Sequence, residues 1–193
     1  MDWRLYKAIY DVSLHHHWVG SLFHGIEAAS IPFMVVVTCA LWLLAPPGGS
    51  RKWKLAAGSA LISAGVALAV NRILAAIWFR QRPFLAHHIA HPWISSRDAS
   101  FPSDHASASF AIAFAVLAFQ PVAGGVFIVF ALVIAVGRLF IGAHYPGDVA
   151  AGFLVGAASA ILVVRAGRPV VGFAVRLVER VTDPLLRPIW RRA

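Results

Sequence analysis

The chain has 193 residues, of which 60 % are hydrophobic and 13 % are charged, and its mean hydropathy is +0.75. A soluble domain of this length could not cover so much apolar surface with so few charges, so the composition indicates a membrane protein. The formal net charge is +9, but seven arginines are concentrated after Val164, and no nucleic-acid-binding motif accompanies them. A basic segment directly after an apolar one favours anionic lipid headgroups, so we expect a bilayer and no nucleic acid as partner.

Five apolar segments approach or exceed the roughly 20 residues that a helix needs to cross the hydrocarbon core. These predicted spans are residues 26–45, 55–79, 103–119, 122–139 and 148–164. Residues 1–24 mix aromatic, basic and histidine side chains and are expected to form a helix in the membrane interface. The basic tail from Arg168 onward has the same character, and either end could instead pack as a sixth helix. The sequence therefore predicts one all-α domain over residues 1–193, a multi-pass membrane bundle of five to six spans.

Basic residues set the expected orientation of this bundle. Arg51, Lys52 and Lys54 join the first two predicted spans, and the arginine-rich tail follows the fifth, so both regions fall on one side. By the positive-inside rule that side is cytoplasmic. The connections at residues 80–101 and 138–147 then face outward, and they carry most of the polar side chains.

Two polar clusters occur at the outer ends of the second and third predicted spans. The first is Arg80-Gln81-Arg82-Pro83, whose guanidinium groups match phosphate oxygens, although arginines at a helix end also extend to lipid headgroups. The second is Pro102-Ser103-Asp104-His105. Ser103 can cap the helix that follows, and the free N–H groups at a helix start also bind phosphate. His105 would lie beside such an anion.

The third cluster surrounds the connection between the fourth and fifth predicted spans. Arg138 ends one span, Asp148 starts the next, and His144 lies between them. An acid in the first turn stabilises a helix, but Asp148 is also close enough in sequence to accept a proton from one nitrogen of His144. The other nitrogen would then be free to attack an electrophile. All three clusters are expected at one membrane face, and together they predict a phosphate site.

The three clusters resemble the motifs of the type 2 phosphatidic acid phosphatase superfamily, KxxxxxxRP, PSGH and SRxxxxxHxxxD. Arg82-Pro83 matches the end of the first motif, residues 102–105 match the second, and Arg138, His144 and Asp148 match the third. The resemblance covers roughly residues 55–165. Within this superfamily the RPF, FPSDH and HYPxD segments are similar to bacterial undecaprenyl-pyrophosphate phosphatases linked to bacitracin resistance.

Three positions depart from the family pattern. Gly137 stands where the third motif has serine, so we expect one weak hydrogen bond to be missing. Ala75 stands where the first motif has lysine, and Arg72 or Arg80 is expected to replace that charge. Asp104 stands where glycine is usual, as in the bacitracin-linked subgroup. An acid there would repel phosphate, so we expect it to turn aside or to pair with Arg80 or Arg97.

The resemblance implies phosphoryl transfer without a metal or another cofactor. The implied phosphate ligands are Arg82, Ser103, Asp104 and Arg138. His144, oriented by Asp148, would attack phosphorus, and His105 would protonate the leaving group and later activate water. The implied reaction is hydrolysis of undecaprenyl pyrophosphate to the monophosphate on the outer face of the bacterial inner membrane, which recycles the cell-wall carrier lipid.

Other functions are compatible with parts of the pattern. The substrate could be phosphatidic acid, phosphatidylglycerol phosphate or another lipid phosphate, because the motifs bind the phosphate rather than the lipid. Vanadate-dependent haloperoxidases share the anion pocket but are soluble. A transporter would need ionisable residues at the membrane midplane, and here only Arg72 is expected there. The histidines at 15, 16, 17 and 24 lack a carboxylate or cysteine framework, so we expect interfacial contacts rather than a metal site.

Overall fold

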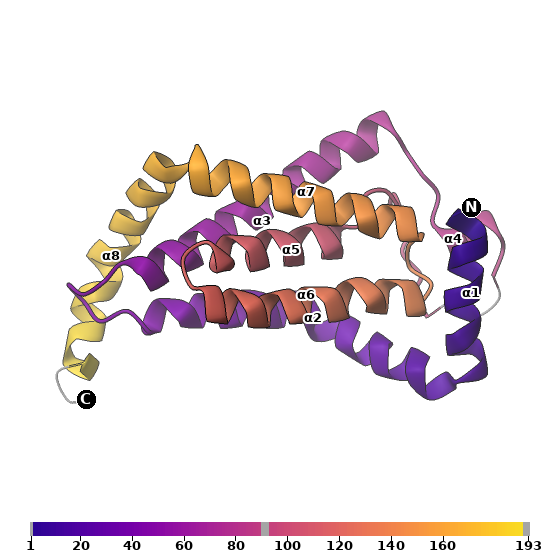
Figure 1. The fold of residues 1–193 in the computed structure, drawn as a ribbon, viewed down its shortest axis with the longest axis horizontal. Coiled ribbons are helices and arrows are strands. Elements are labelled where there is room, and N and C mark those ends of the chain that lie inside the picture. The colour runs from indigo at the N-terminus through magenta and orange to yellow at the C-terminus, as the bar shows by residue number, and fades with distance from the viewer. Residues whose placement is uncertain (1, 90–92, 191–193) are drawn as a thin grey trace.

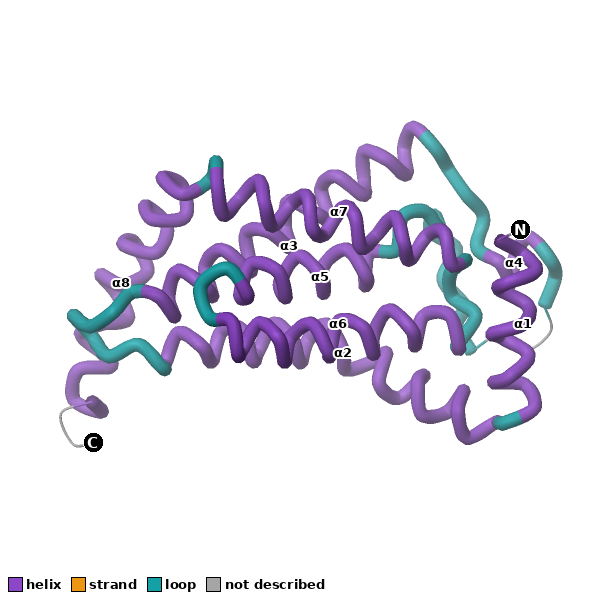
Figure 2. Tube along the Cα trace, viewed as in Figure 1, coloured by secondary structure: helices purple, strands orange, loops and turns teal. Residues whose placement is uncertain are grey.

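The computed structural model describes residues 2–89 and 93–190, and every regular element in that part of the chain is a helix. The helices are α1 (Asp2–His15), α2 (His17–Leu43), α3 (Lys52–Ile77), α4 (Pro83–Ala86), α5 (Asp104–Leu117), α6 (Pro121–Phe140), α7 (Pro146–Arg165) and α8 (Arg168–Trp190). Figure 1 shows a long bundle with α1 across one end and α8 across the other. The connecting loops gather at these two ends (Figure 2).

Four helices, α2, α3, α6 and α7, are long and apolar enough to cross a membrane. Prolines mark where several helices begin: Pro83, Pro121 and Pro146 each occupy a first-turn position, where the missing N–H costs nothing. The prediction of an all-α membrane bundle is therefore confirmed. The first span differs in detail, because α2 begins at His17 rather than at residue 26.

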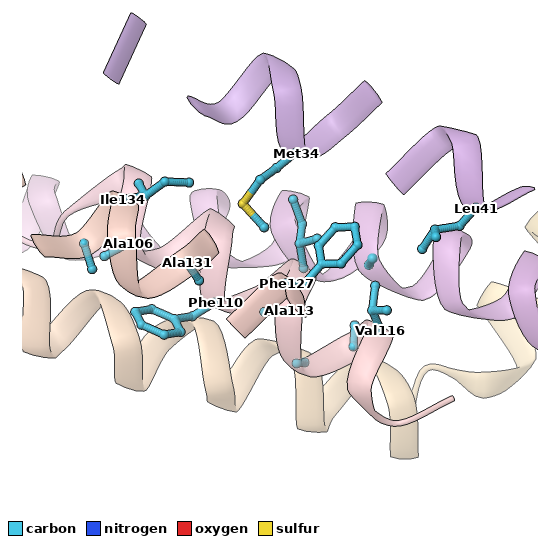
Figure 3. Packing of buried hydrophobic residues seen from close by; sticks show 14 of the residues in the cluster. Met34, Leu41, Ala106, Phe110, Ala113, Val116, Phe127, Ala131 and Ile134 are labelled. Atoms are coloured by element: carbon cyan, nitrogen blue, oxygen red, sulfur yellow. The ribbon is translucent and has the colours of Figure 1, made fainter. Parts of the chain in front are cut away.

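The third predicted span is the central helix of the bundle. It has 14 residues and is about 21 Å long, shorter than the hydrocarbon core of about 30 Å. It packs against α3, α6 and α7, and nearly all its side chains from Ala106 to Val116 are buried. Phe110 and Val116 meet Met34 of α2 and Phe127 of α6 in the hydrophobic core (Figure 3). The neighbouring helices, rather than lipid, therefore surround α5.

Two glycines allow α7 to approach α5 closely. A side chain at Gly152 would place its Cβ 2.9 Å from the carbonyl oxygen of Ser103, and one at Gly156 would lie 2.6 Å from that of Ser107. The pair has the small-xxx-small spacing that brings membrane helices into backbone contact. The close contact holds the starts of both helices at one level, and the Ser103 N–H donates to the carbonyl of Asp148 at 3.1 Å.

The N-terminal helix packs on the protein as well as being amphipathic. Tyr6 and Tyr10 of α1 are buried against Tyr145, next to the start of α7. The carboxylate of Asp2 accepts a hydrogen bond from the N–H of Gly147 at 2.9 Å. Residues 1–24 were expected to form one interfacial helix. The structure divides them between α1, which covers the end of the bundle, and α2, which begins after a break at His16.

The C-terminal helix α8 closes the opposite end. Its Val171 and Val175 are buried, and Val175 lies next to Gly58 of α3. Arg51 pairs with Glu179 at 2.8 Å, and Lys54 pairs with Asp183 at 2.6 Å. The exposed apolar side chains on α8 are Val170, Phe173, Leu177, Val178, Val181, Leu185 and Trp190. The two basic regions predicted to share one side of the membrane therefore lie together, at the end of the bundle opposite α1.

Candidate active site

The sequence-predicted site residues come together at the end of the bundle that α1 covers (Figure 1). They come from five segments: the loop before α4, the start of α5, the last turn of α6, the connection after it and the first turn of α7. In that order they are Arg82, Ser103 with Asp104 and His105, Arg138, His144, and Asp148. Arg82, Ser103, Arg138, His144 and Asp148 are all buried.

His144 is the centre of this cluster and is only 1 % exposed. Nη1 of Arg82 and Nη2 of Arg138 each lie 3.3 Å from its Nε2, and its Nδ1 lies 2.7 Å from the carbonyl oxygen of Ser100. Guanidinium groups only donate, so Nε2 is the acceptor, and Nδ1 carries the proton that is donated to Ser100. The ring therefore presents the lone pair of Nε2 to the space between the two arginines.

The surroundings of His144 keep this ring neutral. Burial lowers the pKa of His144 to about 4, and the positive charges of Arg138 and Arg82 act in the same direction. Asp148 opposes these effects without cancelling them. At neutral pH the Nε2 lone pair is therefore available, which is what a nucleophilic imidazole needs.

Asp148 acts on His144 mainly through its charge. Its Oδ2 lies 3.8 Å from Nδ1 of the ring, while the hydrogen bond from Nδ1 goes to the carbonyl of Ser100. The sequence predicted Asp148 as the acceptor of this proton, but the acceptor in the structure is a backbone oxygen, and the carboxylate lies just beyond hydrogen-bond distance. Asp148 itself accepts from Arg80 Nη1 at 2.6 Å, from Ser100 Oγ at 2.5 Å and from the N–H of Tyr145 at 3.0 Å. These bonds fix the backbone on both sides of the ring.

Arg138 has one edge available to a ligand. Its Nη1 donates to Glu27 Oε1 at 2.5 Å, and its Nη2 faces His144. Among the residues that the structure describes, none accepts a hydrogen bond from its Nε, although this atom is buried. Nε and Nη2 form the side edge of a guanidinium, which binds two oxygens of a phosphate or carboxylate. That edge adjoins Nε2 of His144.

Arg82 is held differently. Its Nε and Nη2 both bind Oδ1 of Asp98, at 3.0 and 2.9 Å, and its Nη1 donates to the carbonyl of Ala143 at 3.1 Å. Burial by itself raises the pKa of Asp98, but the hydrogen bond from Ser96 and the charge of Arg82 outweigh it and lower this pKa. Asp98 is therefore ionised and occupies the side edge of Arg82.

The start of α5 supplies a capped helix end and a histidine. Ser103 is buried, and its Oγ accepts from the N–H of Ala106 at 3.5 Å, which is a helix cap. His105 is partly exposed, and its Nε2 lies 3.7 Å from Oε1 of Glu27. His105 thus faces the same carboxylate that holds Arg138.

Asp104 turns toward α3. Its Oδ1 accepts from Asn71 Nδ2 at 2.7 Å, and its Oδ2 lies 3.9 Å from Arg72 Nη2. Neither Arg80 nor Arg97 is its partner, contrary to one of our expectations. The side chain is engaged by α3, so the group that Asp104 can offer to phosphate is its backbone N–H.

The two arginines proposed to replace the missing lysine have other partners. Arg72 is largely exposed and lies beside Asp104. Arg80 pairs with Asp148 and with Asp2 of α1 at 2.7 Å, and its guanidinium stacks on the ring of Tyr145 at 3.8 Å. Arg80 therefore neutralises Asp148 and ties α1 to the site.

Three residues of the site were not identified from the sequence. Glu27, Asp98 and Ser100 contact Arg138, Arg82 and His144, respectively. The sequence contained a signal for one of them. Glu27 is the only charged residue in the apolar segment 26–45, and ionisable groups within such segments are costly and often functional. Asp98 and Ser100 lie in a polar loop and have no comparable signature.

Comparisons with known proteins identify the family of this chain. Residues 55–170 match the PAP2 superfamily. The chain is 31 % identical to undecaprenyl-diphosphatase BcrC of Bacillus subtilis over 97 % of this chain and 96 % of that protein. It is 29 % identical to a decaprenylphosphoryl-5-phosphoribose phosphatase of Mycobacterium tuberculosis, over 68 % and 71 % of the two chains.

A solved structure has the same fold. It is the transmembrane PAP2-type phosphatidylglycerolphosphate phosphatase from Bacillus subtilis, which matches with a TM-score of 0.63 at 19 % identity. The match covers 87 % of this chain and 85 % of that one.

Proposed function

Because this chain belongs to the PAP2 superfamily, we propose that it hydrolyses undecaprenyl pyrophosphate to the monophosphate through a phosphohistidine at His144. The observation that carries the proposal is the position of His144 Nε2 between Arg82 and Arg138, next to a guanidinium edge whose Nε has no partner among the described residues. The name of the near-full-length Bacillus subtilis relative supports the choice of substrate. No metal is required, since arginines and helix starts supply the positive field.

The first chemical step forms a covalent bond to the protein. The terminal phosphate binds to the side edge of Arg138, to Nη1 of Arg82 where it faces His144, and to the N–H groups at the start of α5. Nε2 of His144 attacks phosphorus, and the bond to the bridging oxygen breaks. His105 donates a proton to that oxygen as the lipid monophosphate leaves. The ring becomes a cation that is stabilised by the Ser100 carbonyl and by Asp148, 3.8 Å from Nδ1.

The second step returns the protein to its starting state. His105, now neutral, takes a proton from a water molecule, whose oxygen attacks the phosphorus of the phosphohistidine. The bond between phosphorus and Nε2 breaks, and inorganic phosphate is released. The two arginines hold the equatorial oxygens in both transition states, so one pocket serves both steps.

The catalytic end of the bundle is proposed to face outward from the bacterial inner membrane. Arg51 and Lys54 lie with α8 at the opposite end, and such basic regions are retained in the cytoplasm. An outward site suits a carrier lipid whose pyrophosphate is generated on the outer leaflet. Hydrolysis there would recycle the lipid for cell-wall synthesis.

A phosphate-release assay on the purified protein tests this function. Undecaprenyl pyrophosphate is compared with phosphatidic acid and phosphatidylglycerol phosphate, and we expect the highest kcat/KM on the pyrophosphate. His144→Ala should retain a normal circular dichroism spectrum and lose turnover by several orders of magnitude. More than about a tenth of the wild-type rate in this variant would contradict the phosphohistidine mechanism. Activity should also persist in excess EDTA; loss that magnesium restores would point to a metal-dependent reaction.

A further inference from the structure

Glu27 is an acidic residue within α2, one of the helices that can cross a membrane. Its side chain is 22 % exposed, and one oxygen, Oε1, reaches two groups of the proposed active site. This oxygen lies 2.5 Å from Nη1 of Arg138 and 3.7 Å from Nε2 of His105. A carboxylate at this position is costly unless it is paired, so its placement between two functional groups requires an explanation.

The contact with Arg138 leaves the phosphate-binding edge of the guanidinium free. Glu27 takes only Nη1, whereas Nε and Nη2 lie along the edge next to His144. A phosphate bound to that edge does not displace Glu27. The carboxylate therefore holds the guanidinium plane in place, in contrast to Asp98, which occupies the equivalent edge of Arg82.

The contact with His105 concerns the proton on its ring. The charged groups around this ring are Arg138 at the end of α6, Arg82 in the loop before α4, Asp98 in the loop before α5 and Glu27 of α2, with His144 also nearby. Burial and the two guanidinium groups lower the pKa of His105, so a nearby carboxylate is needed to stabilise its protonated form. The separation of 3.7 Å exceeds a hydrogen bond, so the proton on Nε2 remains available to a leaving group.

We propose that Glu27 is a positioning residue that orients Arg138 for phosphate and stabilises His105 in its protonated form before the proton is transferred. This inference rests on the proposed phosphohistidine reaction. In the first step the proton moves from Nε2 of His105 to the bridging oxygen as the phosphorus–oxygen bond breaks. In the second step Nε2 recovers a proton from the attacking water. Glu27 contacts neither phosphorus nor the leaving group.

The test compares Glu27→Gln, Glu27→Asp and Asp98→Asn in full-length purified protein. Glu27→Gln keeps an acceptor for Arg138 and removes the charge. We expect kcat on undecaprenyl pyrophosphate to fall by roughly tenfold or more. KM and the inhibition constant for vanadate should stay the same or decrease, because the pocket loses a negative charge. Asp98→Asn removes a charge that also acts on His105 but leaves the contact with Arg138 intact, so we expect a smaller loss of kcat than in Glu27→Gln.

A second readout depends on the leaving group. A lipid monophosphate must expel an alkoxide and relies more on a proton donor than a pyrophosphate does. The loss in kcat for Glu27→Gln should therefore be larger on phosphatidic acid than on undecaprenyl pyrophosphate. Glu27→Asp keeps the charge and should have a kcat between those of the wild type and Glu27→Gln.

Several outcomes would overturn the inference. These are an unchanged kcat in Glu27→Gln, a parallel loss of vanadate binding and turnover, equal losses on both substrates, or a kcat for Glu27→Asp no higher than for Glu27→Gln. If Glu27→Gln does not fold, the inference is tested by the kcat of Glu27→Asp relative to the wild type. An equal loss on both substrates would again overturn it. Failure of the phosphohistidine mechanism can be distinguished from failure of this inference, because only the former would leave His144→Ala active.

Discussion

The protonation state of His144 can be measured directly and follows from its surroundings. The ring is buried and flanked by Arg82 and Arg138, and its pKa is lowered from an ordinary 6.5 to about 4. A histidine with a lowered pKa becomes protonated only at a lower pH. Near pH 5.5 about 3 % of such rings carry a second proton, whereas about 90 % would do so at the ordinary pKa.

Nitrogen NMR on protein labelled with ¹⁵N-histidine in detergent micelles would follow this ring. His144→Asn identifies its signals by their loss. We expect a neutral ring through pH 5.5, with the proton on Nδ1, because that atom donates to the carbonyl of Ser100 and Nε2 accepts from the arginines.

Two results would refute this reasoning. A titration midpoint for His144 between pH 6 and 7 would mean that burial and the two arginines do not control the ring. A proton on Nε2 of the neutral ring would mean that the lone pair points at Ser100 rather than at the phosphate pocket. Bound phosphate or vanadate should move the midpoint upward, since a nearby anion favours the imidazolium.

Other predictions concern the active-site pocket, the close contact between α5 and α7, and the orientation of the protein in the membrane. Arg138→Lys removes the two-donor edge beside Nε2 and should lower kcat/KM for the pyrophosphate at least about a hundredfold, with near-wild-type rates contradicting the role of that edge. Gly156→Ala places a Cβ 2.6 Å from a backbone oxygen of α5 and should destabilise the protein by about 1–3 kcal/mol, as measured by thermal unfolding in detergent. Gly65→Ala is its control in α3, since a Cβ there has no neighbour within 4 Å. Equal effects of the two changes on stability would argue against close packing between α5 and α7. In a chain whose natural cysteine is replaced, Ser95→Cys should react with an impermeant maleimide from outside the cell and Ser50→Cys should not. The reverse labelling would place the catalytic end in the cytoplasm.

Helix positions and most of the site could be predicted because the signals for them are local. An apolar run of sufficient length predicts a membrane helix whatever surrounds it, and a proline in the first turn marks its start. The spacing from Arg138 through His144 to Asp148 places one residue in the last turn of α6, one in the short connection and one in the first turn of α7. The segment at 103–119 was correctly predicted as a helix, but α5 is shorter than a span. Hydropathy cannot distinguish a helix that faces lipid from one enclosed by other helices.

The role of the N-terminal segment depended on long-range packing. Composition predicted an amphipathic helix, which α1 is, but the segment's polar and aromatic side chains also fit partners far along the chain. Asp2 binds the N–H of Gly147, and Tyr6 donates to the carbonyl of Gly142 at 3.3 Å. Such contacts join residues more than a hundred positions apart, and they leave no periodic pattern in the sequence.

By itself the sequence determined the class of the protein, the order of its helices and which side chains meet in the candidate active site. These follow from residue type and spacing over short stretches. The tertiary structure decided which group each charge meets. Glu27 reaches Arg138 across 111 residues, Asp104 turns to α3, and the proton of His144 goes to a backbone carbonyl. The physical reason is that a buried charge takes its partner from whatever the packed helices bring within about 3 Å, and that choice is made by the fold as a whole.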